Sequence, residues 1–280
     1  MSYSVNNHKL RVGASNAEFV RSPNIGGILV PQFLVIHYTA SGPGSDIAKY
    51  FSSPAANVSA HLVVRRDGTI KQCVPFNVVG WHAGKSSWRD RRGVLHVGLN
   101  QSSIGIEIEN WGPLHKAGAG WVSWTKVPVD SGSVIEATHK YGSPSGGWEA
   151  YGERQIDSVI GAARAICDAY GIEEIVGHDD IAPGRKSDPG PAWNMKSFIA
   201  RVQGRDSGDP DFWVVNSPTG LNLRDGASAS AALKLPAPLP NGTRVQMLEA
   251  SGNWRYVSVL DALNVPTASG WVHGAYLRDI

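Results

Sequence analysis

The chain is organised around one charged loop with the sequence Gly177-His178-Asp179-Asp180-Ile181-Ala182-Pro183-Gly184-Arg185-Lys186-Ser187-Asp188-Pro189-Gly190. The loop carries one imidazole, three carboxylates and two cationic side chains between prolines and glycines, which restrict or permit special backbone conformations. Such a composition is typical of a rigid loop whose side chains point at one place. We interpret it as half of a metal site that distant parts of the chain must complete.

Length and composition limit the possible classes of protein. With 280 residues, 42% of them hydrophobic, the chain can bury a full core and is long enough for more than one domain. A net charge of +2 gives no reason to expect nucleic acid as a partner, although a mildly basic chain suits an anionic polymer such as a bacterial wall. The most apolar run, residues 28–36, is interrupted by Pro31 and is too short to span a bilayer, so we expect no membrane insertion.

A second candidate ligand follows the apolar run Phe33-Leu34-Val35-Ile36, which predicts a buried strand. His37 ends this run, and a loop rich in glycine and proline comes directly after it. The last side chain of such a strand lies at the edge of its sheet, where functional sites usually form. We expect Ser45 to cap a short helix after this loop, and Asp67-Gly68 to join two further strands, 59–64 and 70–74, in a hairpin.

Residues 104–109 (IGIEIE) alternate strictly between apolar and other residues. In a strand this pattern places Glu107 and Glu109 on one face, which is either a solvent-exposed face or the source of a catalytic base. Residues 153–170 have helical spacing and end at Gly171, and 195–202 predict a closing helix. The segment between the strand pattern at 104–109 and the first of these helices, about 111–151, is rich in Trp, Gly and Ser and has no sustained period. We interpret it as an ordered insertion at the rim of a cleft that can contain a short hairpin.

Residues 205–211 form a polar stretch that we interpret as a linker, and the pattern of apolar residues changes after it. Residues 212–280 contain short apolar runs separated by turn residues, a pattern that predicts a small all-β barrel without a catalytic cluster. The two cysteines, Cys73 and Cys167, stand in apolar surroundings, so we expect buried thiols instead of a disulfide. The predicted architecture is an α/β domain at 1–204 followed by this smaller domain.

Together, His37, His178 and Asp188 supply two imidazoles and one carboxylate. This is a ligand set for catalytic zinc that leaves a position open for water or substrate, and the lack of cysteine ligands argues against a structural zinc site. Zinc makes bound water more acidic and polarises a carbonyl, so amide hydrolysis further needs a base and a positive charge for the developing oxyanion. Glu107 fits the first role and Lys186 the second.

Five segments of the chain resemble, in order, the motifs of zinc-dependent N-acetylmuramoyl-L-alanine amidases: 35–39 (VIHYT), 59–61 (SAH), 81–84 (WHAG), 103–107 (SIGIE) and 177–190. The resemblance covers residues 30–203. It implies the fold of peptidoglycan-recognition proteins and phage amidase-type lysozymes, a mixed central sheet flanked by helices. The implied substrate is the amide that joins the lactyl group of N-acetylmuramic acid to L-alanine, in peptidoglycan or in muropeptides.

The resemblance also assigns residues. The zinc ligands of the family fall on His37, His178 and Asp188, its catalytic glutamate on Glu107 and its catalytic lysine on Lys186. An aspartate at position 188 resembles the recycling-amidase branch, whereas many relatives carry cysteine there. Cleft positions that contact substrate in the family correspond to three further residues, His61, Trp81 and Arg185.

Residues 212–280 resemble bacterial SH3-like modules through Leu221-Asn222-Leu223-Arg224, Gly252-Asn253-Trp254 and Gly270-Trp271-Val272. Such modules often bind cell-wall peptide, although a domain that only packs against the catalytic unit is an open alternative. Two alternatives also stand for the whole chain, a module that recognises peptidoglycan without cutting it and an unrelated zinc peptidase.

The N-terminus shows no basic start followed by an apolar core, so we expect no Sec signal and synthesis in the cytoplasm. Action on the periplasmic wall would then require release through a holin, as for an endolysin, or a contractile secretion system. Nothing in the sequence indicates an oligomeric state.

Overall fold

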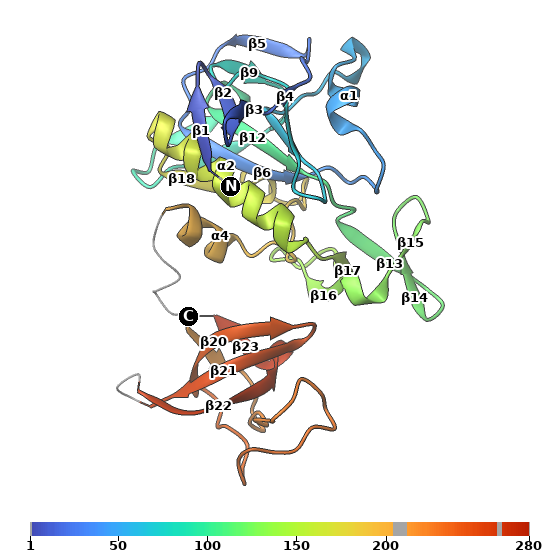
Figure 1. Ribbon diagram of the computed structural model, residues 1–280, viewed down its shortest axis with the longest axis vertical. Coiled ribbons are helices and arrows are strands. Elements are labelled where there is room, and N and C mark those ends of the chain that lie inside the picture. Colours follow the sequence, from blue (N-terminus) through green and yellow to red (C-terminus); the bar gives the residue numbers. More distant parts are fainter. Residues whose placement is uncertain (1, 204–211, 262–264, 280) are drawn as a thin grey trace. The chain divides into compact units, whose positions relative to one another are not determined.

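The computed structural model describes residues 2–203, 212–261 and 265–279 (Figure 1). The chain divides into two compact units, Met1–Gly204 and Arg205–Ile280. The linker expected at 205–211 lies outside the described residues. No helix in the described parts of the chain is long and apolar enough to cross a membrane.

The first unit is built on a six-stranded sheet with the strand order β18-β6-β12-β7-β8-β4. Its strands are β4 (Glu18–Phe19), β6 (Phe33–Tyr38), β7 (Leu62–Val64), β8 (Ile70–Gln72), β12 (Ser103–Ile108) and β18 (Glu174–Gly177). Strand β6 pairs in parallel with β12 and β18, whereas β7 and β8 form the antiparallel hairpin predicted around Gly68. The mixed sheet is therefore confirmed, and the carboxyl ends of β18, β6 and β12 lie side by side.

Helix α2 (Glu153–Tyr170) crosses one face of this sheet and ends at Gly171, which adopts a left-handed conformation (Figure 1). Its apolar stripe packs with the sheet and with helix α4 (Met195–Val202) in one core, to which Ile36, Ile106, Val159, Ile166 and Phe198 belong. Both helices agree with the predicted spans. The short helix α1 (Ile47–Phe51) begins one residue later than expected, because Asp46 and not Ser45 caps it by accepting the Lys49 N–H at 3.1 Å.

Smaller elements complete the first unit. They are β1 (Tyr3–Asn6), β2 (Lys9–Val12), β3 (Ser15–Asn16), β5 (Ile25–Ile28), η1 (Pro54–Ala56), β9 (Val78–Gly80), β10 (Ser87–Arg89), β11 (Leu95–Val97) and η2 (Leu99–Gln101). Both cysteines are free thiols, as expected, and burial raises their pKa values to about 12.

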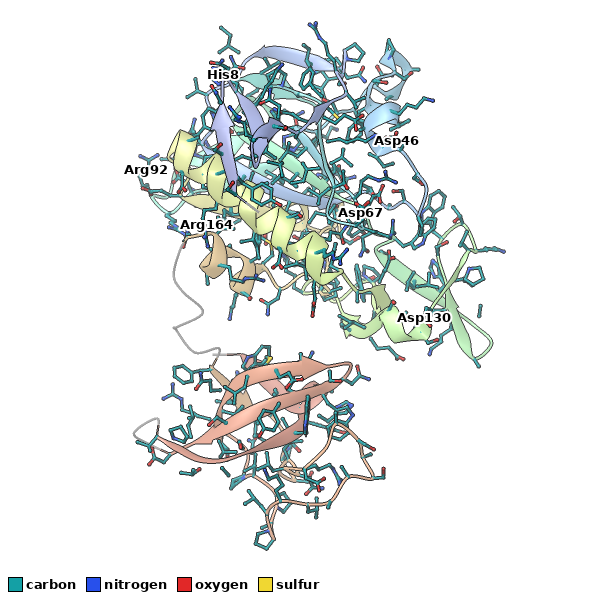
Figure 2. All side chains as sticks on the ribbon, in the orientation of Figure 1. His8, Asp46, Asp67, Arg92, Asp130 and Arg164 are labelled. Atoms are coloured by element: carbon teal, nitrogen blue, oxygen red, sulfur yellow. The ribbon has the colours of Figure 1, made fainter. Side chains whose placement is uncertain are left out.

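The tryptophan-rich insertion is more regular than its sequence indicates. It forms a five-stranded antiparallel sheet from β13 (Pro113–Ala117), β14 (Gly120–Val122), β15 (Pro128–Val129), β16 (Val134–Thr138) and β17 (Ser145–Glu149), with η3 (Ser131–Ser133) between β15 and β16. Trp111, Leu114 and Trp121 build its own small core, and Figure 2 shows Asp130 at its surface. Strands of two to five residues are too short to produce a recognisable period, which explains why only a hairpin was foreseen.

The second unit is a five-stranded antiparallel sheet in the order β22-β21-β20-β19-β23. Its strands are β19 (Phe212–Val215), β20 (Arg244–Ser251), β21 (Trp254–Leu260), β22 (Pro266–His273) and β23 (Leu277–Asp279), with η4 (Gly274–Tyr276) before the last. The unit buries its own cluster, which includes Val215, Leu223, Val257 and Val272. The segment Leu221-Asn222-Leu223-Arg224, which carries part of the likeness to SH3-like modules, forms isolated bridges at Leu221 and Arg224, and that likeness stays a prediction.

Candidate active site

Three neighbouring strands bring together side chains that are far apart in the sequence. On β12, Glu107 lies opposite His37 of β6, and on β18 Gly177 lies opposite Ile36, so that His178 follows directly beside His37. The carboxyl edge of a sheet is where α/β proteins usually bind ligands. The topology thus explains why two histidines and one glutamate separated by more than 60 residues share one site.

The charged loop folds back to add the third ligand. The backbone N–H of Asp179, in the short helix α3 (His178–Ile181), donates to the carbonyl of Asp188 at 2.8 Å, which places the Asp188 side chain beside His178. Asp180 accepts the N–H of Gly177 at 2.8 Å. Asp179 is buried and pairs with His139 of the insertion, Nε2 to Oδ2, at 2.9 Å. Asp179 and Asp180 therefore shape the loop and are not ligands.

The three predicted ligands converge on one point. Nδ1 of His37 and Nδ1 of His178 are 2.8 Å apart, and each lies 2.9–3.0 Å from Oδ2 of Asp188. Zinc bonds of about 2.0–2.1 Å separate the ligand atoms of a tetrahedral site by roughly 3.3 Å. The observed triangle is close to that size, and all three residues are at least 94% buried.

The chemistry of this donor set also fits a cation. A hydrogen atom placed on one imidazole nitrogen points to a single acceptor, so protons cannot link three mutually close atoms with good geometry. One central cation satisfies all three lone pairs at once. The residues present therefore fit the zinc that the sequence predicts.

Electrostatics keeps the donors in the forms that bind metal. Burial, and next to it the neighbouring His178, lowers the pKa of His37 to about 4, so this imidazole is neutral at physiological pH. Burial opposes ionisation of Asp188, but hydrogen bonds from His178 and His37 outweigh it and hold the pKa of Asp188 well below its usual range. Metal binding requires this combination of neutral imidazole and ionised carboxylate.

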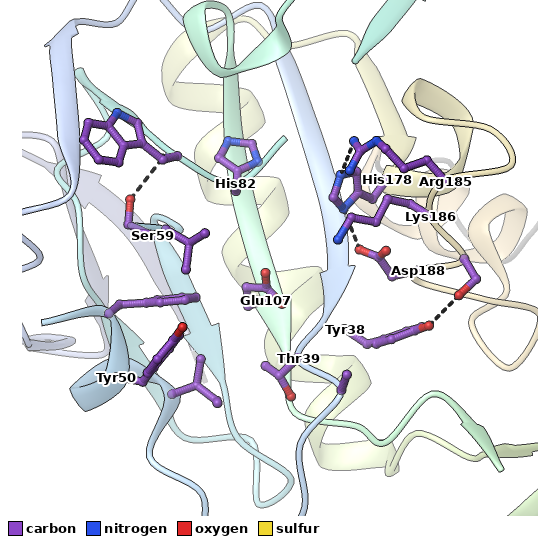
Figure 3. Close-up of a pocket in the computed structure, with 16 residues that line it drawn as sticks. Tyr38, Thr39, Tyr50, Ser59, His82, Glu107, His178, Arg185, Lys186 and Asp188 are labelled. Carbon is purple, nitrogen blue, oxygen red and sulfur yellow. Dashed lines mark hydrogen bonds and ion pairs between the residues drawn. The ribbon is translucent and has the colours of Figure 1, made fainter. Parts of the chain in front are cut away.

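The ligands lie beside a cleft of about 450 Å³. Figure 3 shows Glu107 between the His178, Lys186 and Asp188 side and the wall formed by Ser59 and Tyr50. In the described parts of the chain, Oε2 of Glu107 is buried without a hydrogen-bond partner. Burial, and next to it the negative charge of Asp188, raises the pKa of Glu107 well above its ordinary value, while Lys186 acts in the opposite direction. A carboxylate in this environment is suited to proton transfer.

The structure separates the three residues expected to contact substrate. Trp81, 37% exposed, and Arg185 both line the cleft. His61 does not: it is fully buried, its Nδ1 accepts the N–H of Gly105 at 3.0 Å, and its Nε2 donates to the carbonyl of Val78 at 2.9 Å. Since both ring nitrogens bind backbone, His61 joins strands of the sheet and the expectation that it lines the cleft is not met.

Several residues that shape the site are not among the predicted site residues. The hydroxyl of Tyr38 is 2.6 Å from that of Ser187, which ties strand β6 to the ligand loop. Lys140 of the insertion contacts the carboxylate of Asp179 at 2.9 Å. The position of Tyr38 directly after a proposed ligand was a usable signal, whereas nothing in the sequence links the insertion to this loop.

Comparison with known proteins agrees with this geometry. The model of the family described as N-acetylmuramoyl-L-alanine amidase (Amidase_2) matches residues 29–191. The 1,6-anhydro-N-acetylmuramyl-L-alanine amidase AmpD of Escherichia coli K12 is 34% identical over 147 residues, which are 52% of this chain and 58% of AmpD. The N-acetylmuramoyl-L-alanine amidase AmiD of the same organism is 37% identical over 167 residues, 56% of this chain and 48% of AmiD. The chain thus spans about half the length of these two curated relatives.

Among solved structures, a selenomethionine derivative of AmpD is 28% identical, with a TM-score of 0.49, and the match covers 71% of this chain and 98% of that one. The family model spans the five predicted ligand and catalytic residues, His37, Glu107, His178, Lys186 and Asp188, and more than half of the chain. The chain therefore belongs to the N-acetylmuramoyl-L-alanine amidase family.

Proposed function

We propose that this protein hydrolyses the amide between the lactyl group of N-acetylmuramic acid and L-alanine, in peptidoglycan or its fragments, with zinc held by His37, His178 and Asp188. The observation that carries the proposal is the triangle of three donor atoms next to the buried carboxylate of Glu107, whose Oε2 has no hydrogen-bond partner among the described residues. The names of AmpD and AmiD support the choice of amide, because both specify the bond to L-alanine or the muramoyl-L-alanine class.

The chemistry that bound zinc supplies is Lewis acidity toward water and toward an amide carbonyl. Glu107 takes a proton from the attacking water and passes it to the leaving nitrogen of L-alanine, a task that its raised pKa favours. Lys186 lines the same cleft and presents a positive charge to the oxygen that becomes negative. Arg185, the neighbour of Lys186, donates to the carbonyls of Ala83 and Lys85 and thereby joins the loop that carries Lys186 to the segment 83–85.

The direct test is incubation of the zinc-loaded protein with purified sacculi and, separately, with a soluble anhydromuropeptide. New alanine amino termini and unsubstituted lactyl groups are the expected products. Binding to sacculi without products would favour a recognition module that does not cut. Cleavage inside the stem peptide with an intact lactyl amide would indicate a zinc peptidase instead.

Substitution of Lys186 by alanine is expected to lower kcat by about 10²–10³, the usual cost of one oxyanion donor, without changing the zinc content. Lys186→Arg, which keeps the positive charge, should retain more activity than Lys186→Ala. Steady-state kinetics on the soluble muropeptide, with metal analysis of each variant, measures both effects. Wild-type kcat in Lys186→Ala would remove the lysine from the mechanism.

We also propose that the second unit is an SH3-like module that binds the cell wall. Support comes from its all-β sheet and from a partly exposed row of aromatic rings, in which Trp254 contacts His273 and His273 contacts Tyr276 at centroid distances of 5.3 and 5.6 Å. Aromatic rings with exposed faces are suited to binding sugars and peptides because they offer large, rigid contact areas.

In the full chain carrying Glu107→Gln to prevent cutting, Tyr276→Ala is expected to weaken sedimentation with sacculi, because Tyr276 is 49% exposed and its ring ends the row. Substitution of the exposed Leu233 by alanine, in the same unit but outside the row, serves as the control. Equal sedimentation of Tyr276→Ala, Trp254→Ala and the control would leave the wall-binding assignment without support.

A further inference from the structure

In each of the two proposed ligand histidines, the ring nitrogen that faces away from the ligand triangle, Nε2, hydrogen-bonds to the same short segment of chain, residues 82–83. When Nδ1 of His37 and of His178 present lone pairs to a cation, Nε2 of each ring carries the hydrogen. Nε2 of His37 then donates to Nδ1 of His82 at 3.0 Å, and Nε2 of His178 donates to the carbonyl of Ala83 at 3.2 Å. Consecutive residues thus orient both imidazoles from behind.

One side chain, that of Asn100, accepts both backbone N–H groups of this segment. Oδ1 of Asn100, in η2, accepts the backbone N–H of His82 at 3.0 Å and that of Ala83 at 2.7 Å. The preceding residue is fixed through both of its backbone groups, because the N–H of Leu99 donates to Ser86 Oγ at 3.0 Å and the carbonyl of Leu99 accepts the Ser103 hydroxyl at 2.6 Å. One amide oxygen therefore controls the two consecutive residues that orient both metal ligands.

The ring of His82 also needs space on the sheet, and a glycine provides it. A Cβ atom added to Gly105 would lie 2.5 Å from Cγ of His82, so any larger residue on this face of β12 would displace the ring. Nε2 of His82 donates onward to the carbonyl of Ser103 at 3.3 Å. Because Nε2 of His82 carries the hydrogen that is donated to Ser103, Nδ1 of the same ring is the acceptor for the hydrogen of His37.

We propose that Asn100 is a positioning residue of the metal site, which acts through the backbone of His82 and Ala83 and thereby orients His37 and His178. The inference rests on the proposed zinc dependence. Groups that orient metal ligands from behind typically contribute about 10–100-fold to metal affinity, because they fix the tautomer and the direction of the ligand lone pair. Asn100 contacts no metal ligand itself, so its effect passes through two hydrogen bonds.

The test is the zinc affinity of the full chain, measured by competition with a chromogenic chelator, together with the thermal midpoint of the metal-free protein. Asn100→Ala removes the acceptor of both N–H groups, and we expect zinc affinity to fall about 10–100-fold. Asn100→Asp keeps an oxygen in the same place and should remain close to the wild type. His82→Phe keeps a buried ring but removes the acceptor of His37 alone, and a fall in affinity is expected here too.

Asn194→Ala is the matched control, because Asn194 Oδ1 also accepts a backbone N–H, that of Ser197 at 3.0 Å, as the cap of α4 away from the site. It should lower the thermal midpoint and leave zinc affinity unchanged. Wild-type zinc affinity in a folded Asn100→Ala would overturn the inference whatever His82→Phe shows, and if Asn100→Ala does not fold, wild-type affinity in His82→Phe would overturn it. If the wild-type chain binds no zinc, the proposed function fails as well, which separates the two failures.

Discussion

Substitution of Asp188 by alanine is expected to abolish both zinc binding and amidase activity. The variant loses the only anionic ligand of the three and leaves the two neighbouring imidazoles, 2.8 Å apart, without their shared acceptor. The loss of affinity should therefore exceed the factor of about 10–100 that removal of a group behind a ligand costs. Metal analysis after dialysis against limited zinc, with product release from sacculi, measures both effects.

Two further variants sharpen this experiment. Asp188→Asn preserves the size of the side chain but not its charge, and should also lose zinc. Asp180→Asn, in the same loop, changes a carboxylate that accepts the Gly177 N–H and pairs with Lys140, so its zinc content should match the wild type. Full zinc occupancy in Asp188→Ala would show that the third ligand has been assigned incorrectly.

Substitution of Glu107 by glutamine should separate catalysis from metal binding. Glutamine has the same shape and cannot take up a proton, so we expect unchanged zinc content and a decrease in kcat of about 10²–10⁴, the usual contribution of general acid–base catalysis. In the wild type, the base is lost as the pH falls through the pKa of Glu107, which burial raises above its ordinary 4.5. The acid limb of the pH–rate profile should therefore lie above pH 4.5, and Glu107→Gln should lack it.

Glu109, the residue directly after the same strand, provides a matched control. Its buried carboxylate lies 3.7 Å from nitrogen atoms of both Arg65 and Arg66, outside the cleft. Glu109→Gln should reduce the stability of the fold and leave kcat near the wild-type value. A loss of kcat in Glu109→Gln equal to that in Glu107→Gln, or zinc loss in Glu107→Gln, would contradict the assigned division of roles.

Glu107 and Glu109 show what a pattern of alternating residues can predict about a site and what it cannot. Strict alternation predicted that both carboxylates share one face of a strand; β12 places Glu107 opposite His37, and Glu109 follows the last residue of the strand. The pattern could not tell them apart, because their surroundings come from other elements: Asp188 and Lys186 face Glu107, whereas arginines after β7 face Glu109.

Histidines show the same limit. His37 and His61 both stand beside apolar strand residues, and local sequence did not distinguish a ligand from a structural residue. His61 is excluded from the cleft because its ring bridges backbone groups of β12 and β9, two strands from different sheets that only the tertiary structure brings together. Its neighbour in the predicted list, Trp81, lines the cleft because β9 ends just before it.

The donor atoms themselves were readable in the sequence, since an imidazole or carboxylate carries its chemistry wherever it lies, and the loop 177–190 supplied two of the three ligands within eleven residues. Convergence of those atoms was decided only in the tertiary structure, where parallel pairing of β18, β6 and β12 aligns three strand ends. The residues that support the ligand side chains could not be predicted from the sequence, because Asn100 accepts backbone N–H groups and Gly105 leaves room for the ring of His82. Such roles depend on which distant residue arrives opposite, and that is set by packing of the whole unit, not by local residue type.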